Sequence, residues 1–337
     1  MIIEMQTAAS QDSIRRVIGK IRGLECEAQI NAGQEKVVIA VLGRDTGSIA
    51  TEIFEALPEV ERVFRIMQPH KLASRDFQQD KTVVKIGDVE IGGQAVIIIA
   101  GPCAVESEEQ VLLTARLVKK LGAKILRGGA YKPSTSPFKF QGMGEDGLRI
   151  LAAAKEETGL KIVTEVLSPR DVELVSECAD ILQIGARNCQ NYDLLEEVGQ
   201  AGKPILLKRG FGMSITEWLQ AADYILRRNN PNLILCERGI KTFEPSTRYT
   251  LDISAVPVIK RFSHLPVIVD PSHAAGDRRY VPDMARAAAV IADGLLIEVH
   301  PNPMEALKDG PQSLTFSGFT ELMADLKRLT AAIGREI

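Results

Sequence analysis

Hydrophobic residues follow two different patterns, one in the first quarter of the chain and another in the rest. The opening segment MIIEM is short and apolar, and Ile14, Val17, Ile18 and Ile21 then recur at helical spacing. The β-branched run EKVVIAVLG predicts a strand, TGSIATEIFEAL a second helix, and VERVFRIM a last strand. Residues 1–68 are therefore expected to form a small α+β domain of the ferredoxin-like or ACT kind.

In the second pattern, short apolar strands alternate with amphipathic helices. After the first of these strands, Ser107 is expected to cap a helix with Gln110 three positions on, and Gly122 to end it. Eight such repeats fit a closed (β/α)8 TIM barrel better than an open doubly wound sheet, and we find no dinucleotide-binding fingerprint. The expected strands begin at residues 96, 123, 161, 180, 204, 233, 266 and 294.

Between these patterns lies a polar segment that predicts the domain boundaries. Residues 69–80 (PHKLASRDFQQD) are expected to be a linker, and KTVVKIGDVEIGG to be a β-hairpin that turns at Gly87-Asp88 and covers the next domain. The catalytic barrel with its hairpin is thus expected over residues 81–337.

Composition narrows the class of protein. The 337 residues are 45% hydrophobic and 25% charged, with 41 basic and 44 acidic side chains, which is ordinary for a globular protein and indicates neither a nucleic-acid nor a membrane partner. The start carries no basic signal-peptide region, so a cytoplasmic location is expected. Five widely spaced cysteines predict no disulfide framework, so any special cysteine should be a ligand or a nucleophile.

Polar side chains recur where the apolar strands end, and in a (β/α)8 barrel these ends ring the catalytic mouth. Salt bridges at the barrel end are an alternative explanation for any single pair, but they require neither a thiol nor a histidine. The positions are Cys103, Arg127, Lys132, Glu165, Gln183, Arg187, Lys208, Arg209, Glu237, Arg238, Asp270, His273, Glu298 and His300.

The cations in this set predict a substrate with several negative charges, most plausibly phosphate plus carboxylate, because uncompensated cations would repel one another. A second group combines a thiol, an imidazole and two carboxylates: Cys103, His273, Glu298 and Asp309. Mixed sulfur, nitrogen and oxygen donors suit a divalent transition metal better than Mg²⁺ or Ca²⁺. Taken singly, two of the four residues have a structural alternative: Cys103 is also typical of a small buried residue, and Asp309 of a turn residue.

Seven segments, in this order, make the sequence recognisable. They are GPCAVES (101–107), RGGAYKPSTSPFKFQG (127–142), QIGARNCQN (183–191), LLKRGFG (206–212), CERGIKTFE (236–244), DPSHAAG (270–276) and IEVHPNP (297–303). Together they closely resemble the 3-deoxy-D-arabino-heptulosonate 7-phosphate (DAHP) synthases, and the N-terminal ferredoxin-like domain resembles that of the type I beta subgroup, where it is a feedback-regulatory module.

The resemblance implies a set of site residues. The divalent metal (Mn, Fe, Co, Zn or similar) would be bound by Cys103, His273, Glu298 and Asp309. Phosphoenolpyruvate would be held by Arg127, Lys132, Arg187, Lys208 and Arg238, with Gly185 and Ala186, and the aldose phosphate would lie along Lys132, Ser134 and Thr135.

The resemblance also implies the chemistry. The metal would polarise the aldehyde of erythrose 4-phosphate, so that C3 of phosphoenolpyruvate attacks it, after which water adds at C2 and phosphate leaves. Lys132 is the favoured proton donor, with Glu165 and a metal-coordinated water as alternatives, and His273 belongs to the reacting centre as a ligand. An aromatic amino acid is a possible effector, and a homotetramer is common in the family.

The sequence departs from the family pattern in two places. Ser134 stands where the family motif Lys-Pro-Arg-Thr has an arginine that usually binds the aldose phosphate, and Lys139 is a candidate to replace its charge, unless it is a solvated loop lysine. In the N-terminal domain, Gln29 and Asn31 stand where feedback-sensitive relatives can have histidine and serine. Two alternative functions remain: a 3-deoxy-octulosonate 8-phosphate synthase, which uses a longer aldose phosphate, and a non-catalytic amino-acid sensor.

Overall fold

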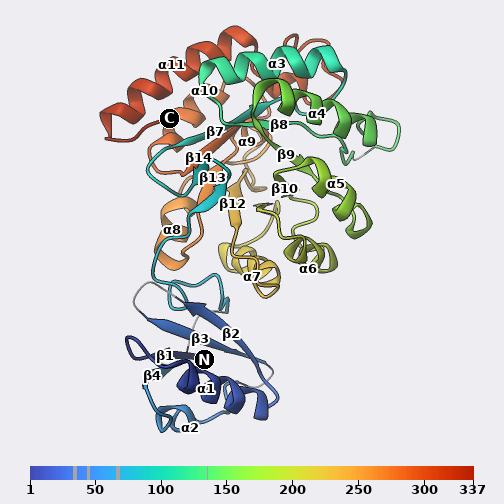
Figure 1. Ribbon diagram of the computed structural model, residues 1–337. Coiled ribbons are helices and arrows are strands. Elements are labelled where there is room, and N and C mark those ends of the chain that lie inside the picture. The colour runs from blue at the N-terminus through green and yellow to red at the C-terminus, as the bar shows by residue number, and fades with distance from the viewer. Residues whose placement is uncertain (33–35, 44–45, 66–68, 135) are drawn as a thin grey trace. The chain divides into compact units, whose positions relative to one another are not determined.

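The computed structural model describes residues 1–32, 36–43, 46–65, 69–134 and 136–337 (Figure 1). The chain divides into two compact units. The N-terminal unit consists of residues 1–81 together with Arg261–His264, and the barrel unit contains the remaining residues.

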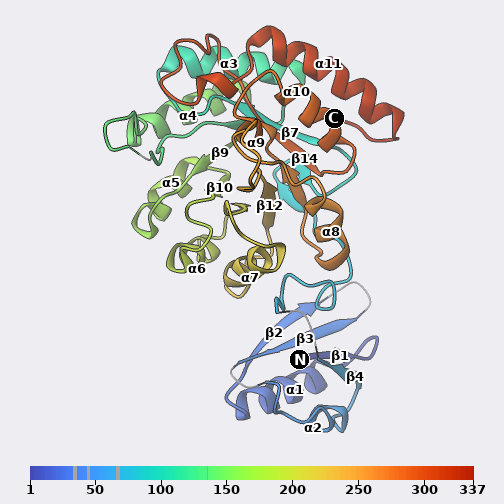
Figure 2. The same ribbon diagram turned by 180° about the vertical axis from the view of Figure 1, so that it is seen from behind.

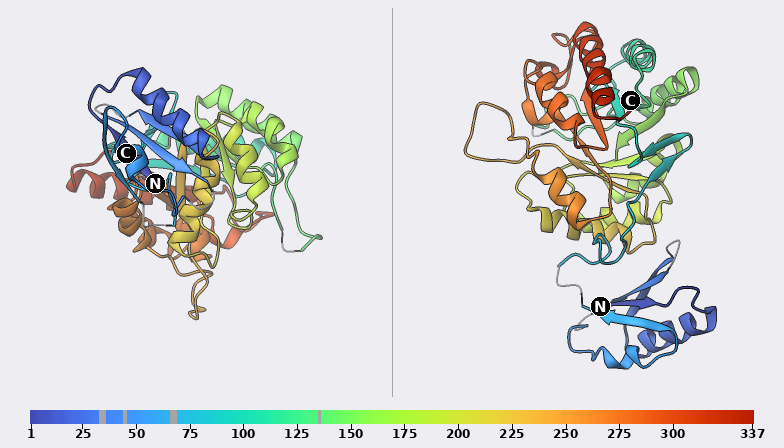
Figure 3. Two further views of the ribbon diagram at one scale, coloured as in Figure 1. Left: turned by 90° about the horizontal axis from the view of Figure 1, so that it is seen from below. Right: turned by 90° about the vertical axis from the view of Figure 1, so that its left-hand side faces the viewer.

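An antiparallel sheet with two helices on one face forms most of the N-terminal unit (Figure 3). Ser10 caps the first helix by accepting a hydrogen bond from the Ser13 N–H, at 3.3 Å. The elements are β1 (Ile2–Met5), α1 (Gln11–Gly23), β2 (Glu27–Ala32), β3 (Val37–Leu42), α2 (Glu52–Glu55) and β4 (Val60–Phe64), with the strands in the order β2-β3-β1-β4. This is the ferredoxin-like arrangement expected from the sequence.

Alternation along the strands builds the core of this unit. Ile3 and Ile39 face the helices and pack against Val17 and Ile21 of α1, as the helical spacing predicts. The second helix, α2, is a single turn and is shorter than the sequence pattern suggests. Thr51 at its start makes no side-chain hydrogen bond that would cap it. Its Phe54 is nevertheless fully buried in the core.

Residues 69–80, expected as a polar linker, belong to the N-terminal unit. Leu72 and Phe77 are buried, and the Leu72 carbonyl accepts a hydrogen bond from His264 Nε2 at 2.8 Å. Ser74 pairs with Ser263 as an isolated antiparallel bridge. Although this segment is polar in composition, it therefore contributes buried apolar side chains to the N-terminal unit.

Eight parallel strands close into a barrel, and helices surround them (Figures 1 and 2). The strands are buried on both faces, which explains their continuous apolar sequences. They are β7 (Ile97–Gly101), β8 (Ile125–Arg127), β9 (Lys161–Glu165), β10 (Ile181–Ile184), β11 (Ile205–Lys208), β12 (Leu233–Glu237), β13 (Val267–Val269) and β14 (Gly294–Glu298).

The first helix of the barrel, α3 (Glu108–Leu121), begins and ends at the residues that the sequence marks. Ser107 accepts a hydrogen bond from the Gln110 N–H at 3.1 Å, and Gly122 ends the same helix in a left-handed conformation, as predicted. The helices are α3 (Glu108–Leu121), α4 (Glu145–Thr158), α5 (Val172–Cys178), α6 (Tyr192–Gln200), α7 (Ile215–Leu226), α8 (Ala255–Phe262), α9 (Pro271–Ala275), α10 (Val281–Ala289) and α11 (Phe316–Ala332), with short 3₁₀ turns η1 (Pro169–Asp171) and η2 (Gly310–Gln312).

The predicted hairpin is β5 (Val84–Ile86) paired with β6 (Val89–Ile91), and it turns at Gly87-Asp88. Its side chains belong to one apolar cluster with the inward-facing residues of the barrel strands, for example Ile97 and Leu206. The hairpin therefore covers an end of the barrel interior. The catalytic residues must lie elsewhere, at the ends where the strands finish.

Candidate functional site

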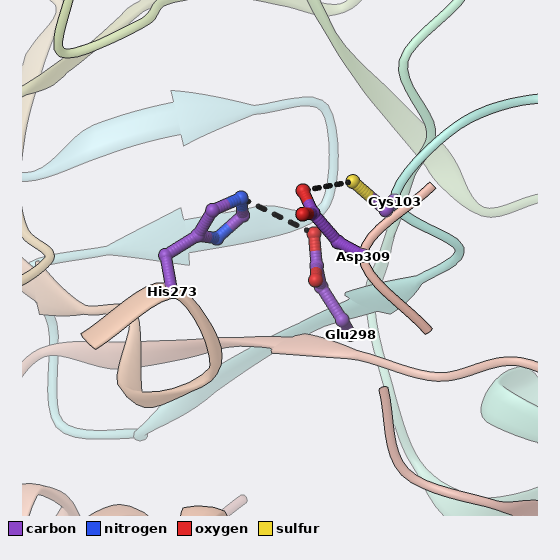
Figure 4. A group of neighbouring side chains, drawn as sticks. All are labelled: Cys103, His273, Glu298 and Asp309. Carbon is purple, nitrogen blue, oxygen red and sulfur yellow. Dashed lines mark hydrogen bonds and ion pairs between the residues drawn. The ribbon is translucent and has the colours of Figure 1, made fainter. Parts of the chain in front are cut away.

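Four side chains from separate segments point toward one another at the carboxyl ends of the strands (Figure 4). Cys103 follows β7, His273 lies in α9, Glu298 ends β14 and Asp309 precedes η2. One donor atom from each lies within 4.8 Å of all the others. The Cys103 Sγ is 3.2 Å from Asp309 Oδ2, and His273 Nε2 is 3.3 Å from Glu298 Oε1.

Local hydrogen bonds fix this cluster. The Asp270 side chain caps α9 by accepting from the His273 N–H at 3.0 Å, and its other oxygen lies 2.7 Å from His273 Nδ1. Ser272 Oγ accepts from the Glu298 N–H at 3.0 Å. Gln312 Nε2 donates to Glu298 Oε2 at 2.5 Å. His273 and Glu298 are thus held by neighbouring residues, as ligands of metal sites commonly are.

The protonation states suit metal binding. Burial lowers the pKa of His273, although Asp270 and Glu298 oppose the shift, so the imidazole is neutral. Burial opposes the charge of Glu298, but the adjoining Arg127 guanidinium lowers the pKa of this carboxyl. Burial and the charge of Glu298 raise the pKa of the Cys103 thiol well above its usual value. A bound cation would reverse that last shift, because a coordinated thiol is deprotonated.

The donor set itself fits a divalent transition metal. One sulfur, one imidazole nitrogen and two carboxylate oxygens form a mixed soft and hard shell, which Mg²⁺ and Ca²⁺ do not favour. The four donors converge from segments up to about two hundred residues apart. The residues expected to bind metal are therefore brought together by the barrel.

A cavity of about 440 Å³ opens beside this cluster. It is lined by most of the residues expected in the site: Lys132, Ser134, Lys139, Glu165, Gly185, Ala186, Arg187, Lys208, Arg238, His273 and Asp309. Thr135, also expected there, lies outside the described residues. Arg127 does not line the cavity but is buried beside it, where it forms an ion pair with Glu298.

The cations of the cavity fall into two classes. Lys208 is paired with Asp270 at 2.5 Å, and Lys132 Nζ lies 3.9 Å from Glu165 Oε2. Four others form no ion pair with any carboxylate of the described residues: Lys139, Arg187, Arg238 and Lys308. Positive charge without an internal partner in a cavity is the electrostatic pattern of an anion site.

Two of these cations share an aromatic surface. The guanidinium carbons of Arg187 and Arg238 lie 5.4 and 5.0 Å from the centre of the Phe211 ring. Arg238 also lies 4.0 Å from the centre of the Tyr249 ring. Stacking orients both guanidinium groups without neutralising them, so their N–H groups remain available to a carboxylate or phosphate.

Lys132 and Glu165 are placed by two glycines. At Gly129, a Cβ would lie 2.2 Å from Lys132 Cδ, and at Gly185 a Cβ would lie 2.0 Å from Glu165 Oε1. Gln183 Nε2 donates to Glu165 Oε2 at 3.4 Å. Burial opposes the charge of Lys132, but Cys103 and Glu165 raise the pKa of its ammonium group, so Lys132 keeps its proton.

Sequence reasoning missed Arg248, Phe211 and Lys308, which line the cavity. It placed Asp270 at the mouth without a role, and the structure shows that Asp270 contacts both His273 and Lys208. Phe211 lies in the segment LLKRGFG and Asp270 in DPSHAAG, so the family-like segments already contained both residues. Arg248 and Lys308 lie on long loops, where no periodicity marked them. Three other strand-end residues have structural partners: Arg209 and Glu237 pair with each other, and His300 pairs with Glu106.

No helix within the described residues is long and apolar enough to cross a membrane.

Comparison with known proteins gives a consistent result over the whole chain. Residues 73–334 match the DAHP synthetase I family, and residues 1–68 match the DAHP synthase ferredoxin-like domain. A phospho-2-dehydro-3-deoxyheptonate aldolase of Thermotoga maritima is 49% identical over all of both chains. A 2-dehydro-3-deoxyphosphooctonate aldolase of Acidithiobacillus ferrooxidans is 33% identical over 69% of this chain and 88% of its own length.

Solved structures agree with these sequence relatives. The crystal structure of the Thermotoga maritima aldolase, described as a DAHP synthase, has a TM-score of 0.80 at 48% identity and covers 99% of this chain and 98% of its own. A truncated form of the 3-deoxy-D-arabino-heptulosonate 7-phosphate synthase from Thermotoga maritima has a TM-score of 0.74 at 50% identity. It covers 79% of this chain and 98% of its own.

Proposed function

The chain belongs to the DAHP synthetase I family, and from this membership we propose how the cavity at the barrel mouth works. The activity is the condensation of phosphoenolpyruvate with erythrose 4-phosphate and water, which yields DAHP and inorganic phosphate. It is the first step of the shikimate pathway to the aromatic amino acids. The N-terminal unit matches the ferredoxin-like domain found with this enzyme.

One observation carries the assignment of the site: unpaired cations line a cavity that borders four converging metal donors. Both substrates are phosphate esters, and phosphoenolpyruvate also carries a carboxylate. A cavity rich in cations, which adjoins a place for a Lewis acid, suits such a pair. A cavity that binds a single amino acid would need fewer positive charges, which argues against the sensor hypothesis.

Cys103, His273, Glu298 and Asp309 are the residues that would hold the divalent metal. When bound, the metal supplies Lewis-acid polarisation of the aldehyde carbonyl. His273 acts in the reaction through this role, with its neutral imidazole oriented by Asp270. Metal analysis of the purified protein identifies the native ion among Mn, Fe, Co, Zn and similar metals.

Phosphoenolpyruvate is proposed to bind along Arg187, Lys208 and Arg238, next to the backbone of Gly185 and Ala186. Two of these cations lack a carboxylate partner among the described residues and are oriented by Phe211. Arg127 pairs with Glu298, and its buried Nε has no hydrogen-bond partner in the described part of the chain. These donors would hold the enol with C3 directed at the aldehyde.

Lys132 is the proposed proton donor. Its ammonium lies in the cavity beside Glu165, and the raised pKa keeps it protonated. When the C3–C1 bond forms, the aldehyde oxygen becomes an alkoxide and takes a proton from Lys132. Glu165 is placed to accept a proton from the water that adds at C2, after which the C2–O bond to phosphate breaks. Ser134, Thr135 and Lys139 are proposed to lie near the aldose phosphate.

The remaining proposals concern the N-terminal domain and the assembly. We propose domain limits of 1–68, 69–80 and 81–337, feedback by an aromatic amino acid through the first domain, a homotetramer and a cytoplasmic location. Asn31 Nδ2 donates to the Phe77 carbonyl at 3.4 Å, so this candidate effector position is tied to the segment at 69–80. Sedimentation with and without each aromatic amino acid tests both assembly and effector.

Release of phosphate from phosphoenolpyruvate that depends on erythrose 4-phosphate tests the function. Competition between erythrose 4-phosphate and a five-carbon aldose phosphate tests the octulosonate alternative, because that synthase would prefer the longer aldehyde. Preference for the longer aldehyde would overturn the assignment. Absence of phosphate release with either aldehyde would favour the sensor.

A further inference from the structure

Lys308 is a cation of the cavity that the sequence motifs did not indicate. It lies on the loop between β14 and η2, directly before Asp309. Its Nζ donates a hydrogen bond to Ser134 Oγ at 3.0 Å, and both residues line the cavity. The contact joins two loops that are more than 170 residues apart in the sequence, so only the closed barrel produces it.

The charge of Lys308 is not neutralised within the described residues. Asp309, its neighbour in sequence, directs one oxygen to Cys103 Sγ and the other to Arg248 Nη1. No other described carboxylate forms an ion pair with Lys308. An ammonium with three donors, of which one is used by a serine hydroxyl, therefore faces the cavity with donors to spare.

Lys308 and Ser134 are a second group of polar side chains on the cavity wall. The first is the group of Arg187 and Arg238 on the Phe211 ring, which the proposed function assigns to phosphoenolpyruvate. Lys308 contacts none of these residues through a hydrogen bond or ion pair, and it comes from the loop that carries Asp309. One loop thus provides a cation for a phosphate and a carboxylate of the donor cluster where the aldehyde would be polarised.

We propose that Lys308, with Ser134, binds the phosphate of the aldehyde substrate and so determines the preference for a phosphorylated aldose. This rests on the proposed function. It also explains how the chain manages with serine at position 134: the positive charge comes from the opposite loop. Lys139 lines the same cavity, but its side chain is exposed and makes no hydrogen bond in the described structure. It is therefore a weaker candidate than Lys308 for binding the aldose phosphate.

Steady-state kinetics of Lys308→Met test the proposal. The Michaelis constant for erythrose 4-phosphate should rise about tenfold to a hundredfold, as expected for loss of a charge-assisted hydrogen bond. The constant for phosphoenolpyruvate should stay within about twofold. With unphosphorylated erythrose, kcat/KM should not fall, because that substrate never used the contact. The matched control is Lys120→Met, an exposed lysine of α3, which removes the same charge without effect.

A second variant separates a binding role from a structural one. Ser134→Arg combined with Lys308→Met should restore most of the affinity for erythrose 4-phosphate, because a guanidinium then reaches the same place. Metal content is measured in every variant. If Lys308→Met loses metal together with aldose affinity, Lys308 acts through Asp309 and the phosphate assignment is overturned.

Equal changes for both substrates, no change for either, or an effect seen only in Lys139→Met would also overturn the assignment. Failure of the proposed function looks different. If the wild-type protein releases no phosphate, that function is wrong, and calorimetric binding of erythrose 4-phosphate to the wild type and to Lys308→Met still decides the role of Lys308. Equal affinities would reject it, and weaker binding by the variant would support it.

Discussion

Charged residues are arranged in opposite ways in the sheet of the N-terminal unit and at the mouth of the barrel. In the sheet, Arg62 of β4 binds the carboxylate of Glu4 in β1 through two hydrogen bonds of 2.8 Å, with Arg62 largely exposed. At the mouth, Lys208 and Asp270 are 5% and 0% exposed, and Arg238 is buried without a carboxylate partner.

The difference shows what each region is built to do. In the sheet, Glu4 is buried, but the guanidinium of the exposed Arg62 accounts for both of its carboxylate oxygens, so its charge is compensated within the unit. Burial of an unpaired cation costs several kcal/mol of folding free energy, and no ion pair within the folded chain offsets this cost. The sheet therefore pairs its buried charge internally, whereas the mouth keeps buried positive charge without a carboxylate partner among the described residues, as the proposed anion site requires.

The largest effect is expected from substitutions in the metal-donor cluster at the barrel mouth. Cys103→Ser should lower metal affinity and turnover by about a hundredfold or more, because a hydroxyl replaces the best ligand for a transition metal. His273→Ala should behave similarly. Metal content after dialysis and phosphate release measure the two effects.

The control is Cys178→Ser. Its thiol is half-exposed and donates to the Leu148 carbonyl. Like Cys26, Cys189 and Cys236, it lies outside the cluster. Full activity of Cys103→Ser without added metal would contradict the assignment.

A pair of methionine substitutions tests whether paired and unpaired cations differ as the comparison requires. Lys208→Met leaves Asp270 buried with less compensation and should lower the free energy of unfolding by about 3 kcal/mol. Arg238→Met removes an unpaired charge and should leave stability unchanged or higher, while the Michaelis constant for phosphoenolpyruvate rises about tenfold or more. Denaturant unfolding and kinetics check both. Equal destabilisation by the two variants would remove the distinction.

In the N-terminal unit, a buried neutral group provides a pH dependence of known sign. Burial lowers the pKa of His264 to about 4, although its hydrogen bond to the Leu72 carbonyl opposes the shift. Unfolded histidine binds a proton below about pH 6.5, so the unfolded state binds more protons between pH 4 and 6.5. Stability is therefore complete above pH 6.5 and falls as the pH decreases through this window.

The variant His264→Gln removes this titration. Between pH 7 and pH 5 the wild-type protein should lose about 2 kcal/mol more unfolding free energy than the variant. Denaturant unfolding at the two pH values measures the difference. Parallel pH profiles of the two proteins would mean that His264 is protonated in the folded state.

The smallest effect on catalysis is expected from removing residues 1–80. The barrel has its own core, so the shortened chain should keep phosphate release within a few-fold and lose feedback by the aromatic amino-acid effector. The solved truncated Thermotoga synthase, which covers 79% of this chain, supports the design. Inhibition retained by the isolated barrel would contradict a regulatory role for the first unit. Failure to fold would point instead to His264 and its neighbours, which lose their partners in residues 70–77.

The fold was largely predictable because its signals are local. The eight apolar strands, the cap at Ser107 and the turn at Gly87-Asp88 depend on neighbouring residues alone. The length of α2 was not predictable, because an apolar face without a cap does not fix where a short helix begins. The burial of Leu72 and Phe77 was also hidden, since the segment around them is polar.

For the site, the sequence determined which residue types stand at the strand ends, and the family resemblance implied the roles of Cys103, His273, Glu298 and Asp309. A parallel barrel brings its carboxyl strand ends to one mouth, so the strand order alone predicts their proximity. The same reasoning reached Lys132, Glu165 and the arginines.

Only the tertiary structure decided which charges are paired. It gave Arg127 to Glu298 and Lys208 to Asp270, and it left Arg187 and Arg238 stacked on Phe211 without a carboxylate. It also placed Lys308 against Ser134. Pairing depends on distances of a few ångströms between loops far apart in the chain, and no periodicity in the sequence encodes those distances.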